Sequence, residues 1–170
     1  MDPRTAQGAS AEIARRQITE RGRYYAPNGM LESVLLKVGS LPAKTQKYVV
    51  RGGNSVGKTA FVCNITSYLC DRYPNPYLDA VPYLRDFKRP NRGRILTTAN
   101  AAKNTYEDEL KKWLRAGKYK SANEGRHHKA VYRFPESGSQ FDIFTFDQDP
   151  DAGESITLDW AIVDEPMSRR

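Results

Sequence analysis

The chain has 170 residues, a hydrophobic fraction of 39%, a charged fraction of 28% and a formal net charge of +7. This length is sufficient for one domain with a buried core, and the composition excludes a disordered chain. No apolar run approaches the roughly 18 residues of a membrane span and the first residues lack a signal-peptide core, so we expect a cytoplasmic protein that contacts no membrane.

The N-terminal part is predicted to be a helical arm, over residues 1–45, ahead of a main domain over residues 46–170. Residues 1–23 are polar with a thin apolar stripe, which is typical of an exposed helical segment. Residues 30–38 have the spacing of a short amphipathic helix that follows a Pro-Asn-Gly turn.

A glycine-rich loop follows a strand-like run at residues 47–51 and precedes a predicted helix that ends near Asp71. The loop fits the pattern G-x-x-x-x-G-K-[ST] with Gly52, Gly53, Asn54, Ser55, Val56, Gly57, Lys58 and Thr59. Backbone N–H groups of such a loop bind phosphate oxygens at the start of the helix. We expect Lys58 to reach the terminal phosphates of ATP and the Thr59 hydroxyl to bind Mg²⁺. The alternative is an ordinary glycine-rich turn.

The middle of the chain alternates between predicted strands and helices. A Pro- and Tyr-rich irregular segment extends to Pro90, and a strand at residues 94–99 then leads into a helix that ends near residue 114. Residues 130–146 are predicted to form a β-hairpin. This alternation indicates an α/β fold with a parallel sheet, right-handed crossovers and an antiparallel hairpin insertion.

The last predicted strand, at residues 158–163, is apolar and ends on the two acids Asp164 and Glu165. Ligand-binding groups of α/β sheets lie at the carboxyl ends of the strands. We expect Asp164 to hold Mg²⁺ and Glu165 to activate the attacking water as a general base. Two acids after a strand are also common in solvated turns, so the assignment depends on the glycine loop upstream.

Two clusters of basic residues, at 88–94 and 126–129, are candidate contacts for a polyanionic partner such as nucleic acid. A run of charges is also typical of a solvated surface. Charge alone leaves both interpretations open.

The arrangement resembles the large terminase subunits, the ATPase motors that package DNA into tailed-phage heads. The resemblance is carried by GGNSVGKTA at 52–60, GRILTTANAAKNT at 93–105, LKKWL at 110–114 and SGSQFDIFTFDQDPDAGESITLDWAIVDEP at 137–166. It implies a P-loop NTPase of the additional-strand, catalytic-glutamate class with a mainly parallel sheet flanked by helices. It also implies ATP hydrolysis that drives double-stranded DNA into a procapsid, with Lys58 and Glu165 as catalytic residues and Thr59 and Asp164 at the metal.

The resemblance extends to partners and to segments outside the two motifs. Family members have an adenine-contacting segment upstream of the glycine loop, and Tyr25 lies in the matching place. The implied partners are DNA, a portal protein, a small terminase subunit and further copies in a ring. The family continues into a coupling strand and a nuclease domain, so we expect a fragment truncated after the carboxylate strand. The arginine that neutralises transition-state charge is not identified, and Arg51, Arg126 and Arg133 are candidates.

Two other functions fit the same motifs. One is a different P-loop enzyme, either a helicase-like ATPase or a small-molecule kinase. The other is a nucleotide-binding fragment without turnover. DNA-stimulated hydrolysis distinguishes the motor from the other enzymes, and nucleotide binding without hydrolysis indicates the inactive fragment.

Overall fold

The computed structural model describes residues 3–39, 57–124, 129–146 and 156–164. The predicted strand at 47–51, the loop residues 52–56 and Glu165 lie outside these ranges. Within the described ranges, no helix is both long enough and apolar enough to cross a membrane.

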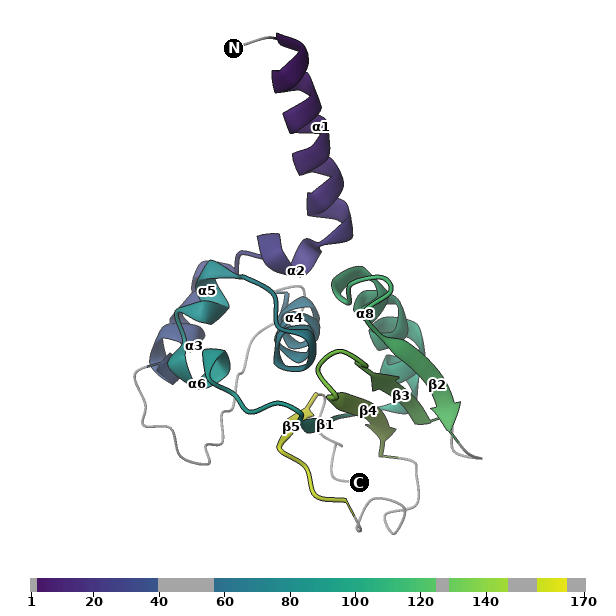
Figure 1. The fold of residues 1–170 in the computed structure, drawn as a ribbon. Helices are drawn as coiled ribbons and strands as arrows, with labels where there is room; N and C mark the ends of the chain where they lie inside the picture. Colours follow the sequence, from purple (N-terminus) through teal and green to yellow (C-terminus); the bar gives the residue numbers. More distant parts are fainter. Residues whose placement is uncertain (1–2, 40–56, 125–128, 147–155, 165–170) are drawn as a thin grey trace.

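The structure combines helices with one sheet (Figure 1). The helices are α1 (Pro3–Thr19), α2 (Arg21–Tyr24), α3 (Gly29–Gly39), α4 (Lys58–Asp71), α5 (Pro76–Asp79), α6 (Pro82–Arg85), α7 (Ala99–Ala101) and α8 (Glu107–Trp113), with a π-helical turn, η1 (Ala102–Tyr106), before α8. The strands are β1 (Arg92–Thr97), β2 (Lys120–Glu124), β3 (Lys129–Arg133), β4 (Gln140–Thr145) and β5 (Trp160–Val163). The predicted helices at 30–38 and through Asp71 and the hairpin are confirmed, and the strand predicted at 94–99 exists but extends from Arg92 to Thr97.

The sheet has the strand order β2-β3-β4-β1-β5. β1 is parallel to both of its neighbours, β4 and β5, whereas β3 is antiparallel to both β2 and β4. The sheet is therefore mixed, which corrects the prediction of a mainly parallel one. The sequence of β2 contains little beyond polar residues, so no apolar alternation marked it as a strand that extends the hairpin.

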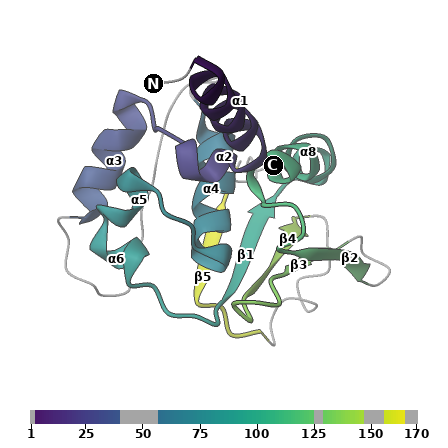
Figure 2. The same cartoon turned by 45° about the horizontal axis from the view of Figure 1, so that its top comes forward.

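Helices α4 and α8 cover one face of the sheet, and α4 runs along the strand direction over β5 and beside β1 (Figure 2). The core between these layers consists of Cys63, Cys70, Ile95, Tyr106, Leu110, Leu114, Ala130, Tyr132, Phe134, Phe141 and Ile143. Gly93 belongs to the same face, because a Cβ atom there would lie 1.9 Å from the indole of Trp160. Only glycine leaves room for that ring. By alternation, Ile95 and Thr97 on β1 also point toward the helices.

The opposite face of the sheet carries a buried ion pair. Arg94 and Asp142 are register partners on β1 and β4, and the Nε atom of Arg94 lies 2.7 Å from Oδ1 of Asp142. Both side chains are 5% exposed, and the ring of Phe144 lies 4.6 Å from the guanidinium carbon. The pair compensates two charges that would each be costly to bury alone.

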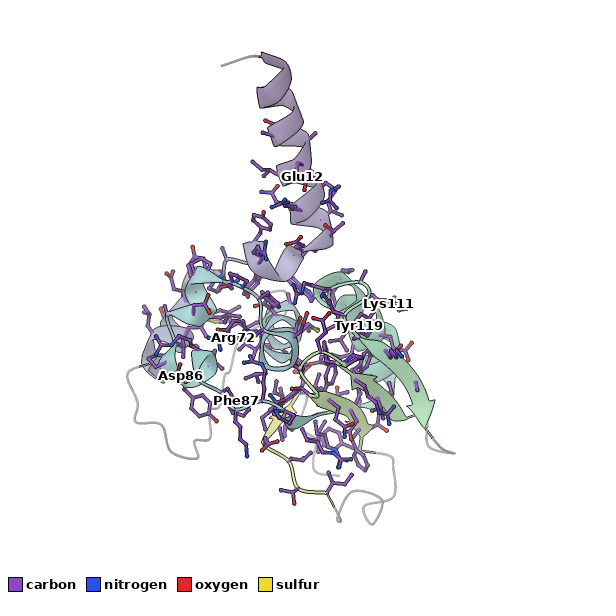
Figure 3. All side chains as sticks on the ribbon, in the orientation of Figure 1. Glu12, Arg72, Asp86, Phe87, Lys111 and Tyr119 are labelled. Carbon is purple, nitrogen blue, oxygen red and sulfur yellow. The ribbon has the colours of Figure 1, made fainter. Side chains whose placement is uncertain are left out.

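The N-terminal helix α1 projects away from the rest of the described chain (Figure 1). Its Glu12 pairs with Arg15 and Arg16 on the same helix, and all three side chains are exposed (Figure 3). Such pairs within a helix stabilise it locally but do not attach it to a core. The predicted exposed helical segment is confirmed.

Candidate functional site

The orientation of α4 determines which edge of the sheet its first turn reaches. We call the edge where β1, β4 and β5 begin the amino edge and the edge where they end the carboxyl edge. The last turn of α4 lies at the amino edge, because Asn91, just before β1, donates from Nδ2 to the Leu69 carbonyl at 2.9 Å. Ser137, just before β4, donates to the Cys70 carbonyl at 2.5 Å. A helix of this length rises about 1.5 Å per residue and spans the sheet, so its first turn lies at the carboxyl edge.

The first turn of α4 is formed by Lys58 and Thr59 after Gly57. Gly57 has a φ of 79°, a left-handed conformation that favours glycine and accounts for this position of the motif. The carbonyl of Gly57 accepts the amide of Phe61 at 3.0 Å, which starts the helical hydrogen-bonding pattern. The turn contains no acidic residue, so its backbone N–H groups and Lys58 form a positive region suited to an anion.

A second helix begins beside Gly57. A Cβ atom on Gly57 would lie 4.0 Å from Nδ2 of Asn28 and 4.0 Å from Cδ1 of Leu31. Asn28 caps α3, since its Oδ1 accepts the amide of Leu31 at 3.1 Å. The N-termini of α3 and α4 therefore meet at the described end of the glycine loop. This contact places the segment upstream of the loop, predicted to lie near adenine, next to the predicted phosphate site.

Asp164 extends β5 at the carboxyl edge. Its amide donates to the Leu96 carbonyl of β1 at 2.9 Å, which continues the parallel pairing one residue beyond Val163. Alternation along β5 places its side chain on the face covered by α4, together with Trp160. Burial raises the pKa of the Cys63 thiol on α4, and the nearby carboxylates of Glu109 and Asp164 raise it further. Asp164 thus lies near the first half of α4, and Lys58 and Asp164 occupy the same edge and face of the sheet.

Thr97 ends β1 at the same edge. Its side chain is 0% exposed, and its Oγ1 atom has no hydrogen-bond partner within the described part of the chain. Because Leu96 is in register with Val163, the next pair along the two strands is Thr97 and Asp164. A buried hydroxyl without a partner is costly, and it is expected where a ligand or a bound water supplies the missing hydrogen bond.

Tyr106 contacts the Asp164 carboxylate directly. Its hydroxyl donates to Oδ2 of Asp164 at 2.6 Å, although the two residues are 58 positions apart. Sequence analysis identified neither Tyr106 nor Thr97 as a site residue. For Thr97 a signal was available, namely a polar side chain at the carboxyl end of a predicted strand. Tyr106 lies in the helix predicted to end near residue 114, and no motif distinguished it there.

Tyr25, the predicted adenine contact, is half-buried in the core. Its ring packs edge-to-face on Trp113 of α8, with centroids 5.2 Å apart, and burial raises the pKa of its hydroxyl to about 12. Its neighbour Tyr24 is 42% exposed. The contact with Trp113 accounts for an aromatic residue at position 25 without a ligand, and Asn28 is the residue of this segment that lies against Gly57.

The basic cluster at 88–94 divides into structural and exposed residues. Arg89 donates to the carbonyls of Tyr68 and Leu69 at the end of α4, and Arg94 pairs with Asp142. Lys88 is exposed and Arg92 is half-buried. Two of the four basic side chains are therefore engaged in the fold rather than presented to a polyanion.

Of the three arginine candidates, Arg133 is the one that the structure describes. Arg133 is in register with Gln140, where β4 begins, so within one copy of the chain it lies at the amino edge. Lys129 of the second basic cluster begins β3, whereas Arg51 and residues 126–128 of that cluster, which include Arg126, fall in ranges that the structure does not describe. The same holds for the glycine-loop residues before Gly57 and for Glu165.

Comparisons with known proteins add no family assignment. A scan against protein-family models, a search of curated proteins and a search of solved structures each return no match for this chain.

Proposed function

We propose that this chain binds ATP with Mg²⁺ and hydrolyses it, as the motor ATPase domain of a DNA-packaging machine similar to the large terminase subunits. The single observation that carries the nucleotide part is that Lys58 and Asp164 share one edge and one face of the sheet. The residues that a P-loop ATPase needs are far apart in the sequence, and their convergence supports the proposal.

The chain's own groups would hold the triphosphate at the first turn of α4. Backbone N–H groups there have no partner within the helix, and the helix dipole favours negative charge at this end. Lys58 adds a charged donor that reaches beyond the backbone to the terminal phosphates. Asn28 and the start of α3 form the neighbouring wall, beyond which the base would lie.

The donors at the carboxyl edge fit Mg²⁺. The Thr59 hydroxyl and the Asp164 carboxylate are hard oxygen ligands, and Mg²⁺ takes one or two such groups together with phosphate oxygens and water. Among the described residues no three His, Cys, Asp or Glu side chains gather, so a nitrogen and sulfur cage for another metal is not formed there. When bound, the ion would neutralise charge on the phosphates, and Glu165 would accept a proton from the attacking water as general base.

The DNA part of the proposal is supported by the terminase-like segments and by the net charge of +7. It is tested by adding linear double-stranded DNA to the ATPase assay. We expect hydrolysis to increase with DNA and the increase to weaken as salt rises, because phosphate contacts release counterions. Hydrolysis that DNA leaves unchanged would contradict the motor role while leaving ATP binding intact.

Replacement of Lys58 tests the nucleotide site itself. Lys58→Ala removes the charged donor to the phosphates, and hydrogen bonds to charged groups contribute about 1.5–3 kcal/mol, so the Kd for ATP should rise about 10- to 100-fold. Isothermal titration calorimetry with ATP and Mg²⁺ measures this affinity. Equal affinity before and after the substitution would contradict the proposed site.

Lys111→Ala is the matched control for this experiment. Lys111 is an exposed lysine on α8 that pairs with Asp108 (Figure 3). The control removes the same charge from the surface away from the first turn of α4. We expect its affinity for ATP to equal that of the unaltered chain.

A further inference from the structure

We propose that Tyr106 is a positioning residue that holds the Asp164 carboxylate in the orientation required for metal binding. The inference rests on the function proposed above and adds a residue to that site. It is carried by the hydrogen bond from the Tyr106 hydroxyl to Oδ2 of Asp164, at 2.6 Å. A bond of this length from a phenol to a carboxylate is in the range of strong, charge-assisted hydrogen bonds.

The ring of Tyr106 is fixed by the core. Its side chain is 0% exposed and belongs to the cluster that includes Ile95 and Leu110. Because the ring cannot move without disrupting this packing, the position of its hydroxyl is set by the fold rather than by the carboxylate. The hydroxyl is thus a rigid donor, and the Asp164 side chain, which is half-buried, orients toward it.

The main chains of both partners are attached to the end of β1. The Asp164 amide donates to the Leu96 carbonyl at 2.9 Å. Two residues later, Thr98 caps the helix that leads to Tyr106, since its Oγ1 accepts the amide of Ala101 at 3.2 Å. A common attachment to neighbouring residues of one strand fixes the separation of the two side chains. This arrangement is expected where one side chain orients another that binds a metal ion.

Tyr106 is the last residue of the π-helical turn η1. The amide of Glu107 donates to the carbonyl of Ala102, five residues earlier, in place of the four of an α-helix. Such widened turns are rare and occur frequently at functional sites. Here the residue that donates to Asp164 is part of the widened turn, so a change in the geometry of the turn alters the position of the donor hydroxyl.

The hydrogen bond has a defined effect on the carboxylate. Rotation about the last bond of an aspartate side chain is broad, so a free carboxylate samples many orientations. With Oδ2 bound to Tyr106, the orientation is restricted, and Oδ1 accepts no hydrogen bond from any other residue that the structure describes. Partners of this kind typically change metal affinity 10- to 100-fold when they are removed.

The test is Tyr106→Phe, which removes the hydroxyl and keeps the ring. Mn²⁺ serves as the probe, and its affinity is measured by electron paramagnetic resonance in the presence of saturating ADP. We expect the Kd for Mn²⁺ to rise about 10-fold, while the Kd for ADP without metal stays unchanged. In hydrolysis, the Mg²⁺ concentration for half-maximal rate should rise while the rate at saturating Mg²⁺ changes little.

Tyr68→Phe is the matched control. Tyr68 is also 0% exposed, and its hydroxyl donates to Oδ1 of Asp79 at 2.5 Å. The control removes the same kind of hydrogen bond from a buried tyrosine next to α5. We expect it to lower stability without changing the affinity for Mn²⁺, and an equal loss of affinity in both variants would overturn the proposal.

A double-mutant cycle keeps the proposal testable if Tyr106→Phe is also less stable. Asp164→Glu displaces the carboxylate from the hydroxyl, so adding Tyr106→Phe to it should not weaken Mn²⁺ binding further. Additive effects, or a single Tyr106→Phe variant with unchanged Mn²⁺ affinity, would overturn the role of Tyr106 without affecting the proposed function. Absence of ADP and Mn²⁺ binding by the unaltered chain would instead reject the proposed function and the inference with it.

Discussion

The two edges of the parallel strands differ in how their polar groups are paired. At the amino edge, Asn91 donates to the Leu69 and Lys88 carbonyls and accepts the indole N–H of Trp160. At the carboxyl edge, the hydroxyl of Thr97 is buried without a partner among the described residues, and the Asp164 carboxylate is bound by Tyr106. Among the residues that the structure describes, the side chain of Asn91 at the first edge is fully hydrogen-bonded, whereas the hydroxyl of Thr97 at the second edge is not.

This difference in hydrogen bonding assigns the amino edge to stability and the carboxyl edge to function. A completed network at the end of α4 joins the helix to the strands and contributes to folding. Unpaired polar groups cost stability and are retained where a ligand completes them. Substitutions at the amino edge should therefore change stability, and substitutions at the carboxyl edge should change ligand binding or turnover.

The largest expected effect is on turnover, at the carboxyl edge. Glu165→Gln removes the general base proposed to follow Asp164, and should slow hydrolysis by about 10² to 10⁴ while ATP binding is retained. Steady-state phosphate release measures this rate. Glu136→Gln is the control, because Glu136 lies at the amino edge, where it pairs with Lys118. Unchanged turnover in Glu165→Gln would remove Glu165 from the role of base.

A smaller effect, on stability, is expected at the amino edge. Asn91→Ala leaves the indole N–H of Trp160 and the Lys88 carbonyl without their side-chain partner, and should lower the free energy of unfolding by about 3 kcal/mol. Urea unfolding measures the change, with Gln17→Ala on the exposed helix α1 as the control. The affinity of the folded protein for ATP should stay the same. A loss of affinity without a loss of stability would reverse the roles assigned to the two edges.

The smallest effect has the opposite sign on stability. Thr97→Val puts a methyl group in place of a buried hydroxyl that has no partner among the described residues, so the free energy of unfolding without ligand should rise by about 1 kcal/mol. Binding of ATP with Mg²⁺ should weaken by at most about 10-fold, because one neutral hydrogen bond is lost. Chemical denaturation and calorimetry give the two values. Destabilisation comparable to Asn91→Ala would show that the hydroxyl is paired within the fold.

Thr66→Val is the control for this comparison. The Oγ1 atom of Thr66 on α4 is also buried without a partner in the described part of the chain, and it lies further from the start of the helix than Cys63. Its replacement should likewise raise stability. It should leave the affinity for ATP unchanged, because the position is nearer the amino edge.

The local structure of the site was predictable from residue patterns. The pattern around Gly57 indicated a sharp turn followed by a helix, and the structure has a left-handed Gly57 before α4. The apolar run before Asp164 likewise indicated a strand that ends on this acid. Both features depend on neighbouring residues in the chain, since backbone conformation and strand ends follow from local side-chain chemistry.

Other features were not predictable because they depend on contacts between distant residues. β2 was missed, since its polar residues form a strand only by pairing with β3, from Lys120 with Arg133 onward. Arg94 looked like part of a surface cluster, yet it is buried because Asp142 is its register partner. Tyr106 lies in a predicted helix, and only its contact with the distant Asp164 distinguishes it.

The sequence by itself determined the fold class, the position of the glycine loop before α4 and the acid that ends β5. Tertiary structure decided that the strands form a mixed sheet and that Lys58, Thr97 and Asp164 share an edge. It also decided that Tyr106 donates to Asp164. The physical reason is that periodicity and turn chemistry act over a few residues, whereas strand register and helix packing set which distant side chains come within hydrogen-bond distance.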